Sequence, residues 1–378
     1  MPDARLLETP TEVEELAETL AGEPLLGFDT EADSFHSYFS KVCLVQVSTR
    51  RADFIIDPLA TGNLAPLGPV LADPGITCVF HGADYDLRIL DRDHGFRVHN
   101  LFDTMIAARL LGYTAFGLSS LLERHFDLRL PKTHQRADWS RRPLPPDMLK
   151  YASADTHHLP GLYDILRSEL EARGRFEWAK EEFELLEKVR HQPREEDPDS
   201  YQRIKGARSL DRRELAVLRE LFETRERMAR ELDRASFRVL GNATLLALAG
   251  ARPKKPRDLA GIPGMPRTSR KPFETELLAA IRRGIEVPEK ELPLRKRGSR
   301  GVRHEPDPAL SKIRKIRDRV AAELELDPGV VGPNALLEAV ARTKPTDRKQ
   351  LLKIQGMRRW QAGLFGEAVL AVTRQALS

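Results

Sequence analysis

Short apolar runs and helical patterns alternate along the first 170 residues of the chain. After an amphipathic segment near the N-terminus, three runs rich in β-branched residues follow one another: LLGFDTE, VCLVQVST and ADFIIDP. Such runs are typical of buried strands, whereas the segments that come later carry apolar residues at helical spacing. Consecutive strands followed by alternating strands and helices predict a mixed sheet with helices packed on it.

One helical pattern begins at Pro146 and carries Tyr151 and Asp155 on a single face. Proline is well tolerated in the first turn of a helix, so this element has a clear start. The pattern then meets Pro160-Gly161, where we expect the helix to kink or stop, because proline inside a helix removes a backbone donor and clashes with the preceding turn.

The chain beyond residue 208 is helical in pattern and rich in arginine. A long helix, a short helix, a turn with glycine and a last helix follow in order, and the same order recurs after a basic segment. This is a degenerate repeat of about 80 residues, with four helices expected in each copy. We therefore predict a mixed-sheet domain with connecting helices over 1–200, a helical domain over 208–288, a basic linker over 289–308 and a second, divergent helical domain over 309–378.

Length and composition agree with several globular domains. The chain of 378 residues exceeds the size at which one core usually stops growing, and 41% hydrophobic residues suffice for packed cores. No run of about 18 apolar residues is present, and the acidic N-terminus lacks the regions of a secretory signal. Cys43 and Cys78 lie in apolar runs, which favours buried free thiols over a disulfide or a zinc site. We expect a cytoplasmic protein without membrane contact, and a monomer by default.

The two halves of the chain carry opposite charge. Residues 1–200 have a net charge of −13 and residues 201–378 a net charge of +17, which together give the overall +4. An acidic half suits a metal-binding core, and a basic half suits attraction to phosphate. The alternative for the basic half is an ordinary solvated surface.

Acids from separate segments form a candidate metal site. Asp29 and Glu31 are two apart, so on a strand they point to the same face, and Tyr151 and Asp155 are neighbours on one helical face. Carboxylate oxygens are preferred by Mg²⁺ and Mn²⁺, and two such ions about 4 Å apart can activate water and stabilise a leaving oxygen. A tyrosine with a pKa of about 10 is a poor base at neutral pH, so Tyr151 is better suited to orienting the water.

A further acid is needed, and Asp84 and Asp86 compete for the place. Both lie at the start of the helical pattern in HGADYDLRIL, where Asp84 could cap the helix and Asp86 would sit in its first turn. Physical reasoning alone leaves the choice open. Asp103, at another strand end, fits a helix cap better than a ligand.

These segments resemble the three motifs of the DEDD exonuclease superfamily in its tyrosine-containing branch, with an order closest to bacterial ribonuclease D. The matching sequences are FDTEAD, HGADYDLRIL and YASADTHHL, although Pro160-Gly161 departs from the usual apolar continuation. In the family the metal-binding acid of the second motif precedes a leucine, which selects Asp86. The helical repeats resemble HRDC domains, with GIPGMP as the loop signature. The implied fold is an α/β ribonuclease H-like exonuclease domain followed by two all-α HRDC-like domains.

The resemblance implies a metal-dependent 3′→5′ exoribonuclease that trims RNA 3′ ends, such as those of tRNA precursors, and releases nucleoside 5′-monophosphates. Two divalent ions, Mg²⁺ or Mn²⁺, would be the cofactors. Asp29 would bridge both ions, Glu31 and Asp155 would complete one site, and Asp86 would serve the second. Two alternatives stay open: a DNA-directed exonuclease of the same superfamily, and an RNA-binding protein without activity.

Candidate RNA contacts lie in three places. Aromatic residues after the first motif could stack on terminal nucleotides or be buried in the core, and cations before the third motif could meet phosphates. Cations around the Gly/Pro turn of the first helical repeat could bind the phosphates of the RNA backbone. In chain order these candidates are Phe35, His36, Tyr38, Lys132, Arg141, Arg142, Lys254, Lys255 and Arg267.

Overall fold

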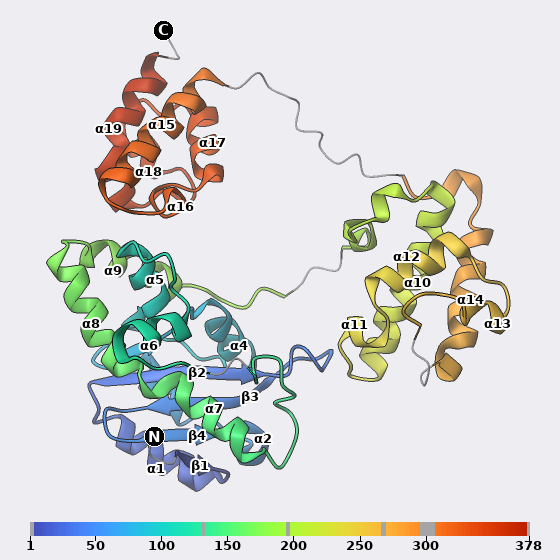
Figure 1. The fold of residues 1–378 in the computed structure, drawn as a ribbon, viewed down its shortest axis with the longest axis horizontal. Coiled ribbons are helices and arrows are strands. Elements are labelled where there is room, and N and C mark those ends of the chain that lie inside the picture. The colour runs from blue at the N-terminus through green and yellow to red at the C-terminus, as the bar shows by residue number, and fades with distance from the viewer. Residues whose placement is uncertain (1–3, 131–132, 194–196, 266–269, 295–306, 376–378) are drawn as a thin grey trace. The chain divides into compact units, whose positions relative to one another are not determined.

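The computed structural model describes the chain apart from residues 1–3, 131–132, 194–196, 266–269, 295–306 and 376–378 (Figure 1). The chain divides into two compact units. The first unit comprises Met1–Ala32, Val42–Gln192 and Arg303–Ser378, and the second comprises Asp33–Lys41 and Pro193–Val302.

Six strands of the described chain form one mixed sheet in the order β1-β4-β3-β2-β5-β6. The pairs β2–β3 and β3–β4 are antiparallel, and the other three pairs are parallel. The predicted mixed sheet is therefore confirmed, but β1 was not foreseen, because a three-residue strand is too short to show a period of two. The bounds are β1 Arg5–Leu7, β2 Leu25–Ala32, β3 Val42–Ser48, β4 Asp53–Ile56, β5 Thr77–Phe80 and β6 Leu101–Asp103.

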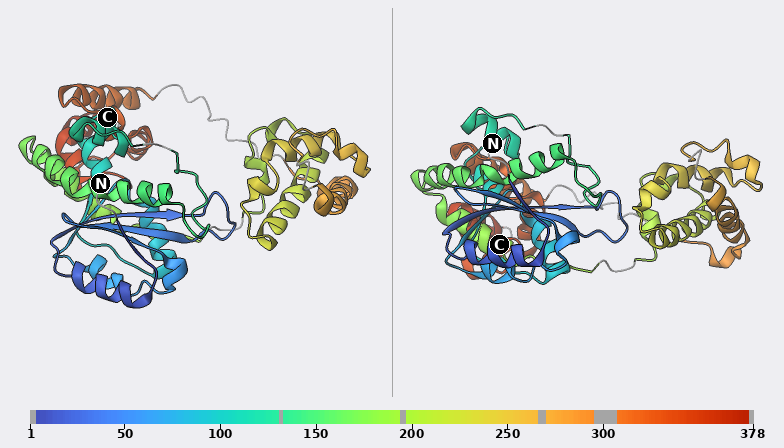
Figure 2. Two further views of the ribbon diagram at one scale, coloured as in Figure 1. Left: turned by 60° about the horizontal axis from the view of Figure 1, so that its bottom comes forward. Right: turned by 90° about the horizontal axis from the view of Figure 1, so that it is seen from below.

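Helices cover both faces of this sheet. In the two views of Figure 2, the green helices α7 and α8 lie on one face and the dark-blue helix α1 on the other. A hydrogen bond of 2.7 Å between Ser48 Oγ and Thr156 Oγ1 joins β3 to α7. The helices are α1 Pro10–Leu20, α2 Pro58–Thr61, α3 Leu67–Ala72, α4 Asp84–His94, α5 Thr104–Leu110, α6 Leu118–Phe126, α7 Pro146–His157, α8 Leu159–Ala172 and α9 Phe176–Leu186.

The predicted break at Pro160 is confirmed. Helix α7 ends at His157, and α8 begins at Leu159 with the proline in its first turn. The junction lies so close to β2 that a Cβ atom on Gly27 would stand 3.0 Å from both the Leu159 Cβ and the Thr156 carbonyl oxygen. Glycine at this position therefore lets the end of α7 approach the strand that carries the first acids.

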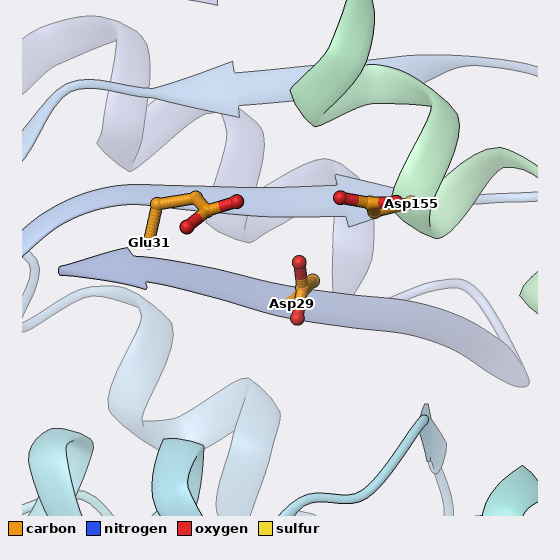
Figure 3. A group of neighbouring side chains, drawn as sticks. All are labelled: Asp29, Glu31 and Asp155. Carbon is orange, nitrogen blue, oxygen red and sulfur yellow. The ribbon is translucent and has the colours of Figure 1, made fainter. Parts of the chain in front are cut away.

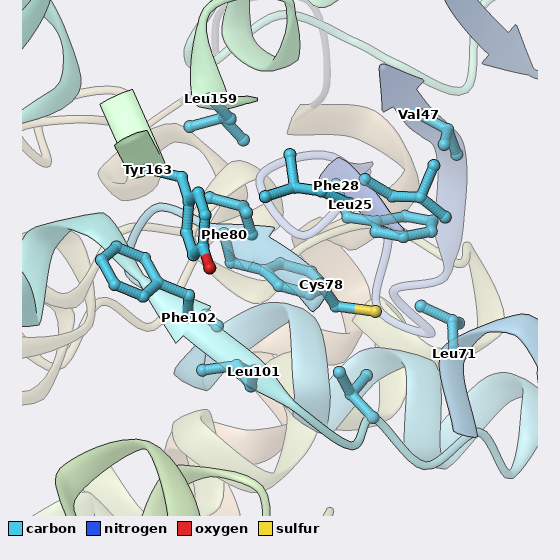
Figure 4. Close-up of a cluster of buried hydrophobic side chains, with 14 of the residues drawn as sticks. Leu25, Phe28, Val47, Leu71, Cys78, Phe80, Leu101, Phe102, Leu159 and Tyr163 are labelled. Atoms are coloured by element: carbon cyan, nitrogen blue, oxygen red, sulfur yellow. The ribbon is translucent and has the colours of Figure 1, made fainter. Parts of the chain in front are cut away.

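The core of the first unit lies between the sheet and its helices (Figure 4). Phe28 and Phe80 stack with ring centroids 5.7 Å apart across the β2–β5 pair. Cys78 is buried in the same cluster, and both cysteines are free thiols, as predicted. Burial raises the pKa of the Cys78 thiol to about 12, so this sulfur stays protonated and inert.

The two helical repeats share one architecture, with five helical segments in the described residues of each, where four were expected. The additional segment is the four-residue helix α11 or α16, which is too short for a periodic signal. The helices of the first repeat are α10 Arg212–Glu231, α11 Ser236–Val239, α12 Asn242–Ala251, α13 Pro256–Leu259 and α14 Arg270–Glu286. The helices of the second repeat are α15 Pro308–Glu323, α16 Pro328–Val331, α17 Asn334–Thr343, α18 Arg348–Leu352 and α19 Arg359–Gln375. Three short 3₁₀ segments, η1 Ser200–Arg203, η2 Ala207–Ser209 and η3 Glu289–Glu291, flank the first repeat.

The second repeat packs within the first unit against α9. Trp178 on α9 stacks on Trp360 at the start of α19, with ring centroids 5.1 Å apart. The Glu182 carboxylate accepts hydrogen bonds from Trp360 Nε1 at 3.0 Å and from Arg358 Nε at 2.9 Å. None of the described helices has both the length and the apolar character that crossing a membrane requires.

Candidate active site

Three carboxylates converge beside the sheet. Asp29 and Glu31 point to one face of β2, and Asp155 reaches the same place from α7, which packs over that face (Figure 3). One oxygen from each group can be chosen so that all lie within 4.8 Å of one another. Strand alternation brings the first two together, and only the packing of α7 on the sheet adds the third.

Asp86 reaches the same pocket from α4, whereas Asp84 does not line it. The Asp86 carboxylate is buried and accepts a hydrogen bond from Thr30 Oγ1 on β2. The Asp84 side chain is 59% exposed and pairs with Arg88 one turn later on the same helix. Asp84 is the first residue of α4 and caps nothing, while Asp103 caps α5 as expected.

The electrostatics of this cluster are those of crowded, buried acids. Burial, followed by the charges of Asp86, Asp155 and Glu31, raises the pKa of Asp29 well above its ordinary value. Burial and the charges of Asp155 and Asp86 raise the pKa of Glu31 to about 9. Burial also raises the pKa of Asp86 and of Asp155 to about 7 each. Like charges in a poorly hydrated place favour a bound cation or a bound proton.

Tyr151 lies one helical turn before Asp155, and its hydroxyl is near enough to the Asp155 carboxylate to counter part of the rise in the pKa of that acid. Its ring packs edge-on against His134, with centroids 5.5 Å apart, and lies near Trp139 at 6.1 Å. Burial, together with the negative charge of the acids, raises the pKa of Tyr151 above its ordinary value. The phenol is therefore held as a hydrogen-bond donor beside the carboxylates.

A pocket of about 430 Å³ opens over these residues. Part of its wall comes from positions that carry no signal in the sequence, because their role depends on the placement of α6 and of the loop before α7. The lining residues that sequence reasoning missed include His81, Tyr85, Leu118, Ser119, Ser120 and Gln135. Apolar and polar groups beside a carboxylate cluster suit a ligand that is part ring and part phosphate.

The aromatic candidates for RNA contact fall in the second unit, within Asp33–Lys41. Tyr38 packs against the buried cluster of Met228, Ala229 and Val239. The structure therefore shows a packing role for the Tyr38 ring. The His36 carbonyl accepts a hydrogen bond from Ala235, and Phe35 is 41% exposed. The expectation that the three aromatic candidates meet nucleotides stays a prediction.

The basic residues predicted to contact RNA differ in their exposure and in the bonds that they form. Arg141 is exposed, but Arg142 binds Asp57 and donates to the Cys43 carbonyl at 2.9 Å, so its guanidinium supports the fold. Lys254 and Lys255 line a surface hollow of about 350 Å³ at the start of α13. The expectations for Lys132 and Arg267 lie outside the described residues.

The donor set fits hard divalent cations. Each of the four acids offers carboxylate oxygen, and no histidine or cysteine belongs to the three-residue cluster in the described chain. Oxygen ligands without sulfur or imidazole match Mg²⁺ and Mn²⁺ better than zinc. The mutual repulsion that raises the acid pKa values is relieved when a cation replaces the protons.

Known proteins match this architecture along the whole chain. Residues 4–171 match the family model of a 3′-5′ exonuclease, and residues 214–281 and 308–373 match that of the HRDC domain. The chain is 32% identical over 376 residues to Ribonuclease D of Gluconacetobacter diazotrophicus, which covers 98% of this chain and 93% of that protein.

Two solved structures are also similar. A protein from Bifidobacterium adolescentis superposes with a TM-score of 0.84 at 26% identity, covering 98% of this chain and 97% of that one. The catalytic core of RRP6 from Trypanosoma brucei gives a TM-score of 0.69 at 32% identity, covering 75% of this chain and 79% of that one. The predicted order, an exonuclease domain and then two HRDC domains, is thereby confirmed.

Proposed function

Because the chain belongs to the ribonuclease D family of exoribonucleases, we propose that it shortens RNA from the 3′ end and matures structured RNAs such as tRNA precursors. Its products are nucleoside 5′-monophosphates. The predicted compartment is the cytoplasm, in keeping with two reduced thiols, and the predicted state is a monomer. The domain limits, 1–200, 208–288 and 309–378 with a basic linker over 289–308, remain part of this proposal.

The observation that carries the proposal is the meeting of Asp29, Glu31 and Asp155, with oxygens within 4.8 Å, in a pocket that Asp86 also lines. In this proposal two divalent ions would be held by these four acids: Asp29 would be shared by both ions, Glu31 and Asp155 would bind one of them, and Asp86 would bind the other. Bound there, Mg²⁺ or Mn²⁺ would lower the pKa of a water and stabilise charge on the leaving oxygen.

Tyr151 orients the attacking water in this proposal. Its ring packs against His134 and lies near Trp139, and these contacts hold the phenol oxygen beside Asp155. A donor held in one place serves a reacting water better than one that must be ordered in each turnover.

Binding of the RNA backbone is assigned to cations outside the acid cluster. The exposed Arg141 and the hollow formed by Lys254 and Lys255 are suited to phosphate, and phosphate contacts hold a nucleic acid without reading its sequence. Lys132 and Arg267 remain candidates for phosphate contacts, and Phe35, His36 and Tyr38 remain candidates for contacts with the terminal nucleotides.

The direct test is a time course on a 3′-extended tRNA beside a single-stranded DNA of matched length, with Mn²⁺ or with EDTA. We expect stepwise shortening of the RNA only in the presence of metal, and no shortening when the RNA ends in a 3′-phosphate. Degradation of DNA alone would favour the DNA-directed alternative. If neither the RNA nor the DNA is degraded in a metal-dependent way, the result would favour the alternative of an RNA-binding protein without activity.

A variant pair locates the chemistry. Asp155→Asn should lower kcat by about two orders of magnitude or more while RNA binding persists, because one charged ligand is lost. The matched control is Asp164→Asn on α8, where the carboxylate pairs with the exposed Arg50. That control should keep turnover close to that of the unmodified chain. Equal turnover in both variants would contradict the assignment of Asp155.

A further inference from the structure

Gln46 lies in the middle of β3 and carries a buried side-chain amide. Its side chain is fully buried, and neither Oε1 nor Nε2 has a hydrogen-bond partner among the described residues. Leaving such groups unpaired costs about 1–3 kcal/mol each, so buried polar atoms in folded proteins are nearly always satisfied. A buried glutamine whose side chain forms no hydrogen bond within the described part of the fold points to a partner supplied by the function of the site.

The register of the sheet places Gln46 beside the acid cluster. Asp29 on β2 and Gln46 on β3 are direct cross-strand partners, so their side chains leave the sheet on the same face. Two residues further along β3, Ser48 reaches Thr156 on α7 through a hydrogen bond, which identifies this face as the one beneath α7. Opposed side chains in such a pair have Cβ atoms about 4.5–5.5 Å apart, within reach of a glutamine amide.

We propose that Gln46 is a positioning residue for Asp29, whose carboxylate accepts a hydrogen bond from the Gln46 amide N–H when divalent cations occupy the cluster. The proposal rests on the proposed function, in which Asp29 bridges those cations. A bridging carboxylate needs a fixed orientation, and a charge-assisted hydrogen bond from a side chain locked by burial provides it. The Gln46 carbonyl oxygen is then left to accept from a water or from a hydroxyl nearby.

A purely structural role predicts something different. If the amide served only the fold, an apolar residue of the same length would lower stability or leave everything unchanged. If it holds Asp29, the same replacement removes two unsatisfied groups and keeps the fold at least as stable, while metal binding weakens.

The test measures metal affinity apart from activity. In Gln46→Met, calorimetry should show Mn²⁺ binding about 10- to 100-fold weaker, whereas the Tm in EDTA should be unchanged or higher. In RNA assays at limiting Mn²⁺, kcat should fall while the KM for RNA stays the same. The control is Val47→Ala, the β3 position that follows Gln46, which is buried in the core on the opposite side of the strand. It should lower the Tm and leave Mn²⁺ affinity intact.

Several results would overturn the inference. If Gln46→Met binds Mn²⁺ with an affinity within about twofold of that of the parent chain, Gln46 has only a structural role in the core. If that variant does not fold, Gln46→Leu takes its place in the same calorimetric test. Failure of the parent chain to bind Mn²⁺ would overturn the proposed function as well, whereas normal binding by parent and variant alike would overturn only the role of Gln46.

Discussion

Thr30 on β2 donates a hydrogen bond to the Asp86 carboxylate on α4, which ties a second acidic segment to the strand of the first motif. Strand alternation directs Asp29 and Glu31 to the face beneath α7 and Thr30 to the opposite face. Strand β2 therefore carries two acids on one face, and from its opposite face it fixes the position of a third acid.

This relationship separates Asp86 from Asp84 experimentally. Asp86→Asn should lower kcat by about two orders of magnitude or more, because a buried charged group in the pocket is lost. Asp84→Asn removes only an exposed ion pair with Arg88, worth about 0–1 kcal/mol, and should leave turnover nearly unchanged. Steady-state degradation of a 3′-extended RNA by both variants gives the answer. Loss of activity in Asp84→Asn with full activity in Asp86→Asn would reverse the assignment.

The metal-free protein should lose stability as pH rises. The pKa of Glu31 is raised from 4.5 to about 9, and burial raises those of Asp86 and Asp155 to about 7. The folded state thus holds more protons than the unfolded chain, and the free energy of unfolding falls as pH rises between the unfolded and folded pKa values. The Tm in EDTA should decline over this range, and Glu31→Gln should flatten the decline above about pH 7.

Added Mn²⁺ should raise the Tm more at the alkaline end of that range than at the acidic end, since the cation replaces protons that are bound at low pH. A Tm in EDTA that is independent of pH from about 5 to 9 would show that the acids are not crowded as the structure has them.

Local periodicity accounts for part of the site and cannot account for the rest. The spacing of Asp29 and Glu31 on a strand, and of Tyr151 and Asp155 on a helix, indicates shared faces without any knowledge of the fold. That Asp86 rather than Asp84 enters the pocket depends on Thr30, a contact between residues 56 positions apart. Pairings of this kind are set by tertiary packing, so for Asp86 only the family resemblance decided.

The same limit explains what was missed in the fold. The pattern of the second repeat was recognisable, but its packing on α9 depends on the stack of Trp178 and Trp360, which are far apart in the chain. Gln46 shows no distinctive signal in an apolar strand, because its unpaired amide is evident only once its neighbours are known.

The tryptophan stack should be a measurable link between α9 and the second repeat. A double-mutant cycle with Trp178→Leu and Trp360→Leu should give a coupling energy of about 0.5–1.5 kcal/mol in denaturant unfolding. The control cycle pairs Trp360→Leu with Trp139→Leu, a buried tryptophan of a separate cluster, and should be additive within about 0.5 kcal/mol. Additivity in both cycles would mean that the stacked rings contribute no specific energy.

Each helical repeat is held by one buried arginine in an equivalent place. Arg225 on α10 donates to the Leu240 carbonyl after α11, and Arg317 on α15 donates to the Gly332 carbonyl after α16. Replacing either by methionine leaves a buried carbonyl unpaired, which costs about 1–3 kcal/mol.

The repeats should respond to these changes separately. In Arg225→Met, hydrogen exchange should quicken in α10 and α12 and stay unchanged in the second repeat, and Arg317→Met should do the converse. The exposed Arg227 on α10 serves as a control, because Arg227→Met removes only surface ion pairs and should cost less than about 1 kcal/mol. Faster exchange throughout both repeats in a single variant would indicate that they unfold as one cooperative body, contrary to the division of the chain into two units.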